Sequence, residues 1–194
     1  MKIFGDLNSG NCLKVKWVSD HLALPYEWIK IDTMKGGSRT PEFLMLNGAG
    51  QVPVVVLDDG RALAQSNAII RYLARDSALI PRDPYLAAKM DEWLFWEQYS
   101  HEPYIAVCRF QMVYLKKSAA ERDPDRVKRG EAALARMEKA LAASRFLAGD
   151  TFTLADVSLL AYTRVAHEGG FDLAAYPSLR RWIGESEQAL HLTG

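Results

Sequence analysis

The pattern of apolar residues changes abruptly near residue 76, and this change constrains the fold more than any other feature of the sequence. Before it, short runs typical of strands alternate with helical patterns, whereas only helical spacing follows it. The intervening stretch Asp76–Pro84 has two prolines and several polar residues, which is typical of a linker. We therefore expect a domain over residues 1–76, a linker over 77–84 and a second domain over 85–194.

The first part of the chain has the alternation of strands and helices expected of a small α/β domain. Its order is β-α-β-(short helix)-β-β-α, which predicts a thioredoxin-like fold. Asp59-Gly60, between the last two strands, is a typical hairpin turn. Strands are predicted over Lys2–Gly5, Tyr26–Asp32, Val52–Leu57 and Arg61–Ala64, and helices over Asn11–Leu24, Glu42–Leu46 and Ser66–Arg75.

The remainder of the chain is predicted to be helical throughout. Tyr85–Lys117 has the spacing of one long helix or two, and Pro103 marks a kink or a division within it. Thr153 and Asp156 have the spacing of a capping box, in which each residue bonds the backbone of the other at a helix start. Two further helices are predicted to begin after Asp123 and near Pro177.

Charge and composition exclude several classes of function. The 24 basic and 24 acidic side chains cancel, whereas nucleic-acid binders usually carry a basic excess, so no nucleic-acid partner is expected. No apolar run approaches ~18 residues and no apolar signal region opens the chain, so no membrane anchor is expected either. The two cysteines and four histidines have no metal-ligand spacing, and no metal is expected. These features predict a soluble, cytoplasmic protein with a small-molecule or protein partner.

The segment Ser9-Gly10-Asn11-Cys12 joins the first predicted strand to the first predicted helix. Backbone amides and the positive end of the helix dipole favour an anion or a thiolate at such a position. A serine hydroxyl and an asparagine amide can both donate a hydrogen bond to sulfur. In the alternative interpretation Ser9 or Asn11 only caps the helix, and Cys12 is a small buried residue. The local sequence leaves both interpretations open.

Two further segments could hold an extended peptide. Pro53 cannot donate to a sheet, so it marks an edge or a turn, and a cis bond would expose the backbone of Val52 to a peptide ligand. The alternative is a proline that only begins a strand. Gln65-Ser66 opens the next helix, where Ser66 could cap the helix or help to bind a carboxylate.

Four motifs follow one another in a set order along the chain. They are Phe4-Gly5-x-x-x-Ser9, Gly50-Gln51-Val52-Pro53, Gln65-Ser66 and Phe152-Thr153-Leu154-Ala155-Asp156. In this order, and with an all-helical remainder, they resemble the cytosolic glutathione transferases over essentially the whole chain. Ser9-x-Asn11-x-x-Lys14, Lys35-Gly36-Gly37 and Pro41-Glu42-Phe43-Leu44 are most similar to the bacterial, theta and nu-like branches. The resemblance implies a thioredoxin-like α/β domain followed by an all-α domain, glutathione as co-substrate, and a homodimer.

The resemblance also implies how the thiol of glutathione is activated. A hydroxyl at the Ser9 position donates a hydrogen bond to the glutathione sulfur and favours the thiolate, and Asn11 shares this task in the nu-like branch. A free thiol has a pKa near ~8.5, and a donor together with a helix N-terminus can lower it by about one unit or more.

The remaining implied contacts hold the rest of the glutathione molecule. The backbone of Val52, before Pro53, matches the clamp on the cysteinyl residue. Gln65 and Ser66 match the pair that binds the γ-glutamyl end, although many relatives have glutamate in place of Gln65. Arg39 falls where relatives place a residue on the glycyl carboxylate, and a guanidinium suits that role. A small shift in the alignment would give this role to Ser38 or Lys35 instead.

The pocket for the second substrate is expected on the first helix of the second domain. Tyr104, Cys108 and Gln111 are spaced so that they lie on one face of that helix. This spacing is expected equally for the wall of a substrate pocket and for a face buried in the core. Some relatives use an acidic residue of this domain across the dimer, and Glu102 is the candidate for it.

Three functions are compatible with these residues. The leading hypothesis is a glutathione S-transferase that conjugates the thiolate to a hydrophobic electrophile, as in detoxification. The alternative is a nu-like disulfide-bond oxidoreductase that uses two bound glutathiones, because Ser9 replaces the first cysteine of a redox Cys-x-x-Cys. The third is a non-catalytic glutathione-binding protein. Ser9, Asn11, Val52-Pro53 and Ser66 are all present, which argues against loss of the glutathione site.

Overall fold

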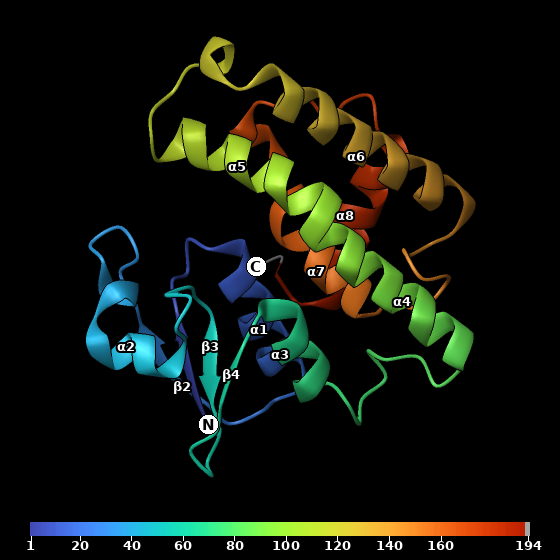
Figure 1. Cartoon of the computed structure of the whole chain (residues 1–194). Coiled ribbons are helices and arrows are strands. Elements are labelled where there is room, and N and C mark those ends of the chain that lie inside the picture. The colour runs from blue at the N-terminus through green and yellow to red at the C-terminus, as the bar shows by residue number, and fades with distance from the viewer. Residues whose placement is uncertain (193–194) are drawn as a thin grey trace. The chain divides into compact units, whose positions relative to one another are not determined.

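The computed structural model describes residues 1–192 and divides into two compact units, Met1–Ser77 and Ala78–Gly194. Figure 1 shows strands in the first unit, in blue to green, whereas the second unit, in green to red, is built of helices.

The first unit contains a four-stranded mixed sheet with the order β2-β1-β3-β4. Its strands are β1 (Lys2–Gly5), β2 (Glu27–Lys30), β3 (Val54–Val56) and β4 (Ala62–Ala64). β1 runs parallel to β2 and antiparallel to β3, and β3 and β4 form the predicted hairpin. All four predicted strands are present, but the second is shorter than predicted because only four residues pair with the four of β1. The third begins after Pro53, which has no N–H to donate.

Helices flank this sheet at the positions that the apolar spacing predicts. They are α1 (Gly10–His21), α2 (Pro41–Leu46) and α3 (Ser66–Leu73), with a 3₁₀ turn at Gly37–Arg39. α1 and α3 pack against each other. The fully buried apolar residues of this core include Ile3, Val15, Val18, Val54, Val55, Ile69 and Ile70. This packing brings the N-terminal residues of both helices to the same part of the unit, as the Asn11–Ser66 contact below demonstrates.

The second unit is helical. Its helices are α4 (Pro84–Trp96), α5 (Glu102–Val113), α6 (Pro124–Ala143), α7 (Leu154–Thr163) and α8 (Pro177–Ala189). The predicted helix over Tyr85–Lys117 is divided by a π-helical turn at Glu97–His101, and Pro103 lies in the first turn of α5, where an N–H is not needed. Within residues 1–192, no helix is both long and apolar enough to cross a membrane.

α7 forms the centre of the second unit, and every one of its residues is buried. The predicted capping box begins it: the N–H and the hydroxyl of Thr153 both donate to Asp156 Oδ2, at 2.9 and 3.1 Å. Asp156 Oδ1 accepts two further bonds, from the Leu147 N–H at 3.0 Å and from Trp182 Nε1 at 2.8 Å. One buried carboxylate thus joins the start of α7, the preceding loop and α8.

Candidate functional site

Ser9 occupies the N-cap position of α1 with an extended backbone, and its side chain makes no capping hydrogen bond. Its N–H donates to the Asp6 carbonyl at 2.9 Å, while its own carbonyl accepts the N–H groups of Cys12 and Leu13. Ser9 is half-buried, and its hydroxyl acts to lower the pKa of the Cys12 thiol. Since the side chain does not cap the helix, the simple capping alternative does not describe it.

Asp6 organises the loop that carries Ser9, a role that we did not predict from the sequence. Its buried carboxylate accepts the Asn8 N–H at 3.0 Å and the Thr33 hydroxyl at 2.9 Å. The first contact closes the turn before Ser9, and the second ties this turn to the loop after β2. An aspartate two residues before a turn asparagine is a local signal of such an Asx turn.

Cys12 is fully buried on the first turn of α1, as the structural alternative for this residue predicts. Its burial raises the pKa of the thiol to about 11, although the N–H of Asp6 and the hydroxyl of Ser9 oppose that rise. The Asp6 N–H reaches Cys12 Sγ at 3.4 Å. A thiol that keeps its proton at neutral pH is a poor nucleophile, so the chain offers no reactive cysteine at this position.

Asn11 and Ser66 are 55 residues apart in sequence, and the fold brings them into contact. Ser66 Oγ donates to Asn11 Oδ1 at 3.0 Å, which fixes the orientation of the Asn11 amide. Ser66 is buried at the start of α3, and Gln65 before it has a left-handed φ of 71° with an exposed side chain. A non-glycine residue in this region is strained, and such strain is concentrated at functional sites. The contact between Asn11 and Ser66 shows that the N-termini of α1 and α3 lie close together, so the positive ends of both helix dipoles act on the same region.

Val52 and Pro53 are joined by a cis peptide bond immediately before β3. Pro53 is buried, and Val52 is half-buried. The cis bond is the one that the peptide-binding alternative requires, and the strand that follows it, β3, lies between β1 and β4 in the sheet.

Arg39 has an exposed side chain whose Nη1 donates to the Ala49 carbonyl at 3.1 Å. The guanidinium lies over Gly50, where a Cβ would meet it. Arg39 thus holds the loop before β3, and its other N–H groups are additional donors. Ser38 and Lys35 are the alternatives to Arg39 for the glycyl carboxylate. Ser38 is buried, and the Lys35 ammonium pairs with Asp32 at 3.6 Å.

Tyr104 and Cys108 both lie on α5 but have different surroundings. Cys108 is fully buried, and its burial raises the pKa of the thiol. Tyr104 is half-buried, and its hydroxyl accepts from Arg129 Nη1 at 3.2 Å. It lines a pocket of about 230 Å³ in the second unit, together with Trp96, Ser100, Arg129, Ala132, Ala133 and Arg136. Cys108 is not among these lining residues, so the structure favours the core alternative for Cys108.

Glu102, the candidate acid of this helix, has its Oε2 bonded to Gln98 Nε2 at 2.6 Å. Within residues 1–192, no three His, Cys, Asp or Glu side chains are grouped so that they could hold a metal ion.

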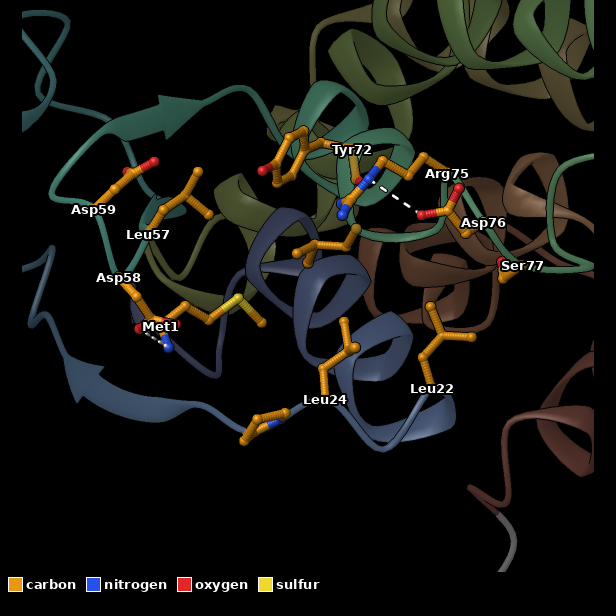
Figure 2. A pocket seen from close by; sticks show the side chains of 12 residues that line it. Met1, Leu22, Leu24, Leu57, Asp58, Asp59, Tyr72, Arg75, Asp76 and Ser77 are labelled. Carbon is orange, nitrogen blue, oxygen red and sulfur yellow. Dashed lines mark hydrogen bonds and ion pairs between the residues drawn. The ribbon is translucent and has the colours of Figure 1, made fainter.

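A separate pocket of about 620 Å³ lies in the first unit (Figure 2). Leu22 and Leu24, beyond the C-terminal end of α1, form part of its wall, and its edge holds the ion pairs Met1–Asp58 and Arg75–Asp76. Ser9 is at the other end of this twelve-residue helix, about 18 Å away by helical rise. The pocket is therefore distinct from the predicted site, and no predicted site residue lines it.

The fold and the site together define a class: a thioredoxin-like unit that presents a serine hydroxyl at a helix N-terminus, followed by a helical unit. Comparison with known proteins identifies the family. The family model described as glutathione S-transferase, N-terminal domain, matches residues 8–76, and the model for the C-terminal domain of the same proteins matches residues 118–185.

Individual relatives agree with the family models. The chain is 32% identical to glutathione S-transferase 3 of Zea mays, over 94% of this chain and 86% of the maize protein. It is 27% identical to the disulfide-bond oxidoreductase YfcG of Escherichia coli strain K12, over 87% and 82% of the two chains. A solved glutathione S-transferase structure from Pseudomonas fluorescens Pf-5 has a TM-score of 0.93 and 44% identity, with 96% and 94% coverage. The protein belongs to the glutathione S-transferase family.

Proposed function

We propose that this protein is a glutathione S-transferase that joins the glutathione thiolate to a hydrophobic electrophile. The observation that carries the proposal is the Ser9 hydroxyl, which lies at the N-terminus of α1 and is not used to cap it. Asn11, on the first turn of the same helix, is fixed by Ser66. The Ser9 hydroxyl and the positive ends of α1 and α3 are suited to stabilise an anionic sulfur.

Catalysis would follow from two effects. The hydrogen bond from Ser9, supported by Asn11 and the helix end, stabilises the thiolate and lowers the pKa of the glutathione thiol. A decrease of about one unit corresponds to ~1.4 kcal/mol and raises the thiolate fraction severalfold at neutral pH. The second effect is approximation, because both substrates are held with the sulfur next to the electrophilic carbon.

Glutathione would be held by the start of α3, by the backbone before β3 and by Arg39. The N–H groups at the start of α3, with Gln65 and Ser66, suit the γ-glutamyl carboxylate, and the backbone of Val52, before the cis-bonded Pro53, suits the cysteinyl residue. Arg39 is proposed for the glycyl carboxylate through the N–H groups that do not bond Ala49. The electrophile is proposed to contact α5, where Tyr104 is the accessible member of the predicted pair with Cys108.

The second candidate is a disulfide reductase, and the similarity to YfcG favours it. In that reaction a glutathione thiolate attacks a disulfide, releases one thiol and forms a mixed disulfide, which a second glutathione resolves to oxidised glutathione. The chain itself would not form the mixed disulfide, because Ser9 has no thiol and Cys12 is buried with a raised pKa.

Two assays on the purified protein separate these candidates: conjugation of a nitroaromatic halide, and glutathione-dependent reduction of a small disulfide. The transferase proposal predicts that conjugation has the higher kcat/KM. A higher kcat/KM for disulfide reduction would assign the protein to the second candidate. Calorimetry that detects no glutathione binding at millimolar ligand would contradict both candidates, whereas binding without either activity would leave the non-catalytic glutathione-binding class.

Ser66→Ala is expected to weaken glutathione binding roughly three- to tenfold, because it removes a buried hydroxyl while the backbone N–H remains. The measurement is the Kd from isothermal titration calorimetry. Ser77→Ala is the matched control, since its hydroxyl bonds the Ala74 carbonyl beyond the other end of α3. Equal Kd values for the two variants would show that the Ser66 hydroxyl does not contribute to glutathione binding.

We further propose a homodimer in which α4 and the π-helical turn after it take part. Phe95 and Tyr99 are 76% and 83% exposed and lie one helical turn apart, so they present adjacent apolar rings to solvent. Phe95→Glu with Tyr99→Glu is expected to convert a dimer to a monomer in sedimentation velocity. The exposed Leu115→Glu is the control that should leave the dimer intact. Sedimentation of the unmodified protein as a monomer would contradict the proposal.

We also propose a cytoplasmic location and a role in detoxification. Both cysteines are free thiols, which suits a reducing compartment. Conjugation of reactive electrophiles to glutathione would serve detoxification directly.

A further inference from the structure

Asp6 follows β1 directly, at the edge of the sheet where the two parallel strands end. β1 and β2 pair in parallel as far as Gly5 and Lys30, so the loops that follow them leave the sheet at the same edge. The first of these loops carries Ser9, and the second carries Thr33. Loops at the carboxyl ends of parallel strands are where α/β folds place the groups that bind ligands.

Asp6 holds the turn of residues 6–9 through both its backbone and its side chain. Within the turn, its Oδ1 accepts the Asn8 N–H at 3.0 Å and its carbonyl accepts the Ser9 N–H at 2.9 Å. Its own N–H donates to Cys12 Sγ at 3.4 Å, which joins the turn to α1. Its Oδ2 accepts the Thr33 hydroxyl at 2.9 Å, which joins the turn to the loop after β2. Because Asp6 is only 7% exposed, little water competes for these bonds.

The position of the Ser9 hydroxyl depends on this turn. The Ser9 side chain makes no capping hydrogen bond, so the backbone of the turn determines where its oxygen lies. A hydrogen bond weakens steeply when its geometry is poor, and a displacement of about 1 Å at a reacting group can cost ~100-fold in rate. Loss of the two carboxylate bonds would therefore weaken the contact between Ser9 and a bound sulfur.

The negative charge of the Asp6 carboxylate would have the opposite effect. A negative charge near the site disfavours a thiolate, so its removal alone should lower the pKa of a bound thiol. Loss of the hydrogen bonds should raise that pKa, because a displaced Ser9 no longer stabilises the anion. The sign of the change in pKa therefore distinguishes a positioning role from an electrostatic one.

We propose that Asp6 is a positioning residue, whose carboxylate ties the turn before α1 to the loop after β2 and so holds the Ser9 hydroxyl where it donates to the glutathione sulfur. The inference rests on the proposed function of Ser9 and adds a second residue on which activation of the thiol depends. Asp6 acts through Ser9 and does not touch glutathione.

The test compares Asp6→Ala, which has no acceptor, with Asp6→Asn, which keeps the shape of the side chain. The amide oxygen can accept the Asn8 N–H, and the Thr33 hydroxyl can turn to accept from the amide nitrogen. The readouts are the pKa of bound glutathione, from the ultraviolet absorbance of the thiolate, and the pH profiles of kcat and KM for conjugation. Asp6→Ala is expected to raise the bound thiol pKa by about half a unit to one unit and to lower kcat about three- to tenfold near pH 6.5, with less than about a threefold change in the Kd for glutathione. Asp6→Asn is expected to restore both the pKa and kcat.

Asp20→Ala is the matched control. The Asp20 carboxylate also accepts a hydroxyl, from Tyr26 at 2.7 Å, but it is exposed and lies toward the other end of α1. Its removal is expected to leave the pKa of bound glutathione unchanged.

A double variant tests whether Asp6 acts through Ser9. In a Ser9→Ala background, Asp6→Ala is expected to cause little further rise in the bound thiol pKa, because both substitutions remove the same hydrogen bond to sulfur. Additive rises would show that Asp6 acts independently of Ser9 and would overturn the inference.

Thr33→Val keeps the inference testable if Asp6→Ala does not fold. Valine has nearly the shape of threonine but has no hydroxyl, so only the bond to Asp6 Oδ2 is lost. This variant is expected to raise the bound thiol pKa by about 0.3 to 0.5 unit. An unchanged pKa would show that the tie between the two loops does not position Ser9, and would overturn the inference.

The outcomes separate this inference from the proposed function. If the unmodified protein lowers the thiol pKa of bound glutathione, and Asp6→Ala leaves that pKa unchanged or lowers it further, the inference is wrong and the function of Ser9 stands. A rise that Asp6→Asn does not restore would also overturn it, because the hydrogen bonds would not then explain the effect. If the unmodified protein does not lower the thiol pKa, both the function and the inference fail.

Discussion

Ser9→Ala is expected to lower kcat/KM for conjugation of a nitroaromatic halide about 10- to 100-fold near pH 6.5, with less than about a threefold change in the Kd for glutathione. In the proposed site, the Ser9 hydroxyl stabilises the sulfur anion and contributes little to holding the rest of the peptide. Its loss therefore raises the pKa of the bound thiol by roughly one to two units, and each unit removes tenfold of the thiolate below that pKa.

The pH dependence gives this prediction a distinctive form. As the pH rises through the higher pKa of the variant, deprotonation by solvent replaces the missing hydrogen bond, so most of the difference in rate should disappear near pH 9 to 10, as for ordinary thiols with a pKa of ~8.5. Ser19→Ala, a buried serine on the same helix, is the control with expected wild-type rates. An unchanged rate for Ser9→Ala would assign stabilisation of the thiolate to Asn11, because Cys12 is fully buried.

Asp156→Ala is expected to lower the free energy of unfolding by about 3–5 kcal/mol. The Asp156 carboxylate accepts four hydrogen bonds from three residues, and all of the groups involved are buried. Alanine removes the acceptor and leaves the N–H of Leu147, the N–H of Thr153 and the indole N–H of Trp182 without it, at about 1 kcal/mol or more each. The loss should appear in urea unfolding followed by circular dichroism.

Asp150→Ala is the matched control for this prediction. Asp150 is exposed in the loop before α7, and its carboxylate has a bond of 3.5 Å from the Arg145 N–H. It should therefore change the free energy of unfolding by less than about 0.5 kcal/mol. A loss below about 1 kcal/mol for Asp156→Ala would mean that these hydrogen bonds do not hold the second unit together.

The order of strands and helices could be predicted because local signals determine it. Pro53 has no N–H to donate to a sheet, and β3 begins at the next residue. Pro103 lies in the first turn of α5, and the Thr153–Asp156 capping box defines the start of α7. The π-helical turn at Glu97–His101 was not predicted, since apolar spacing does not distinguish one hydrogen-bond register of a continuous helix from another.

The candidate site depends on contacts that sequence spacing does not contain. Asn11 and Ser66 meet only because α1 and α3 pack together, and we associated them through the family resemblance alone. The bond from Thr33 to Asp6 likewise joins two loops that are 27 residues apart. The four-residue spacing of Tyr104 and Cys108 gave no indication that Cys108 would be fully buried and Tyr104 only half-buried.

Titration of glutathione bound to the unmodified protein shows whether the site lowers the pKa of the glutathione thiol. Its thiolate absorbance, followed against pH in the presence of saturating protein, gives the pKa of the bound thiol. The Ser9 hydroxyl and the N-terminus of α1 predict a value at least about one unit below the ~8.5 of a free thiol. A bound thiol that titrates with the pKa of free glutathione would contradict this account of the site.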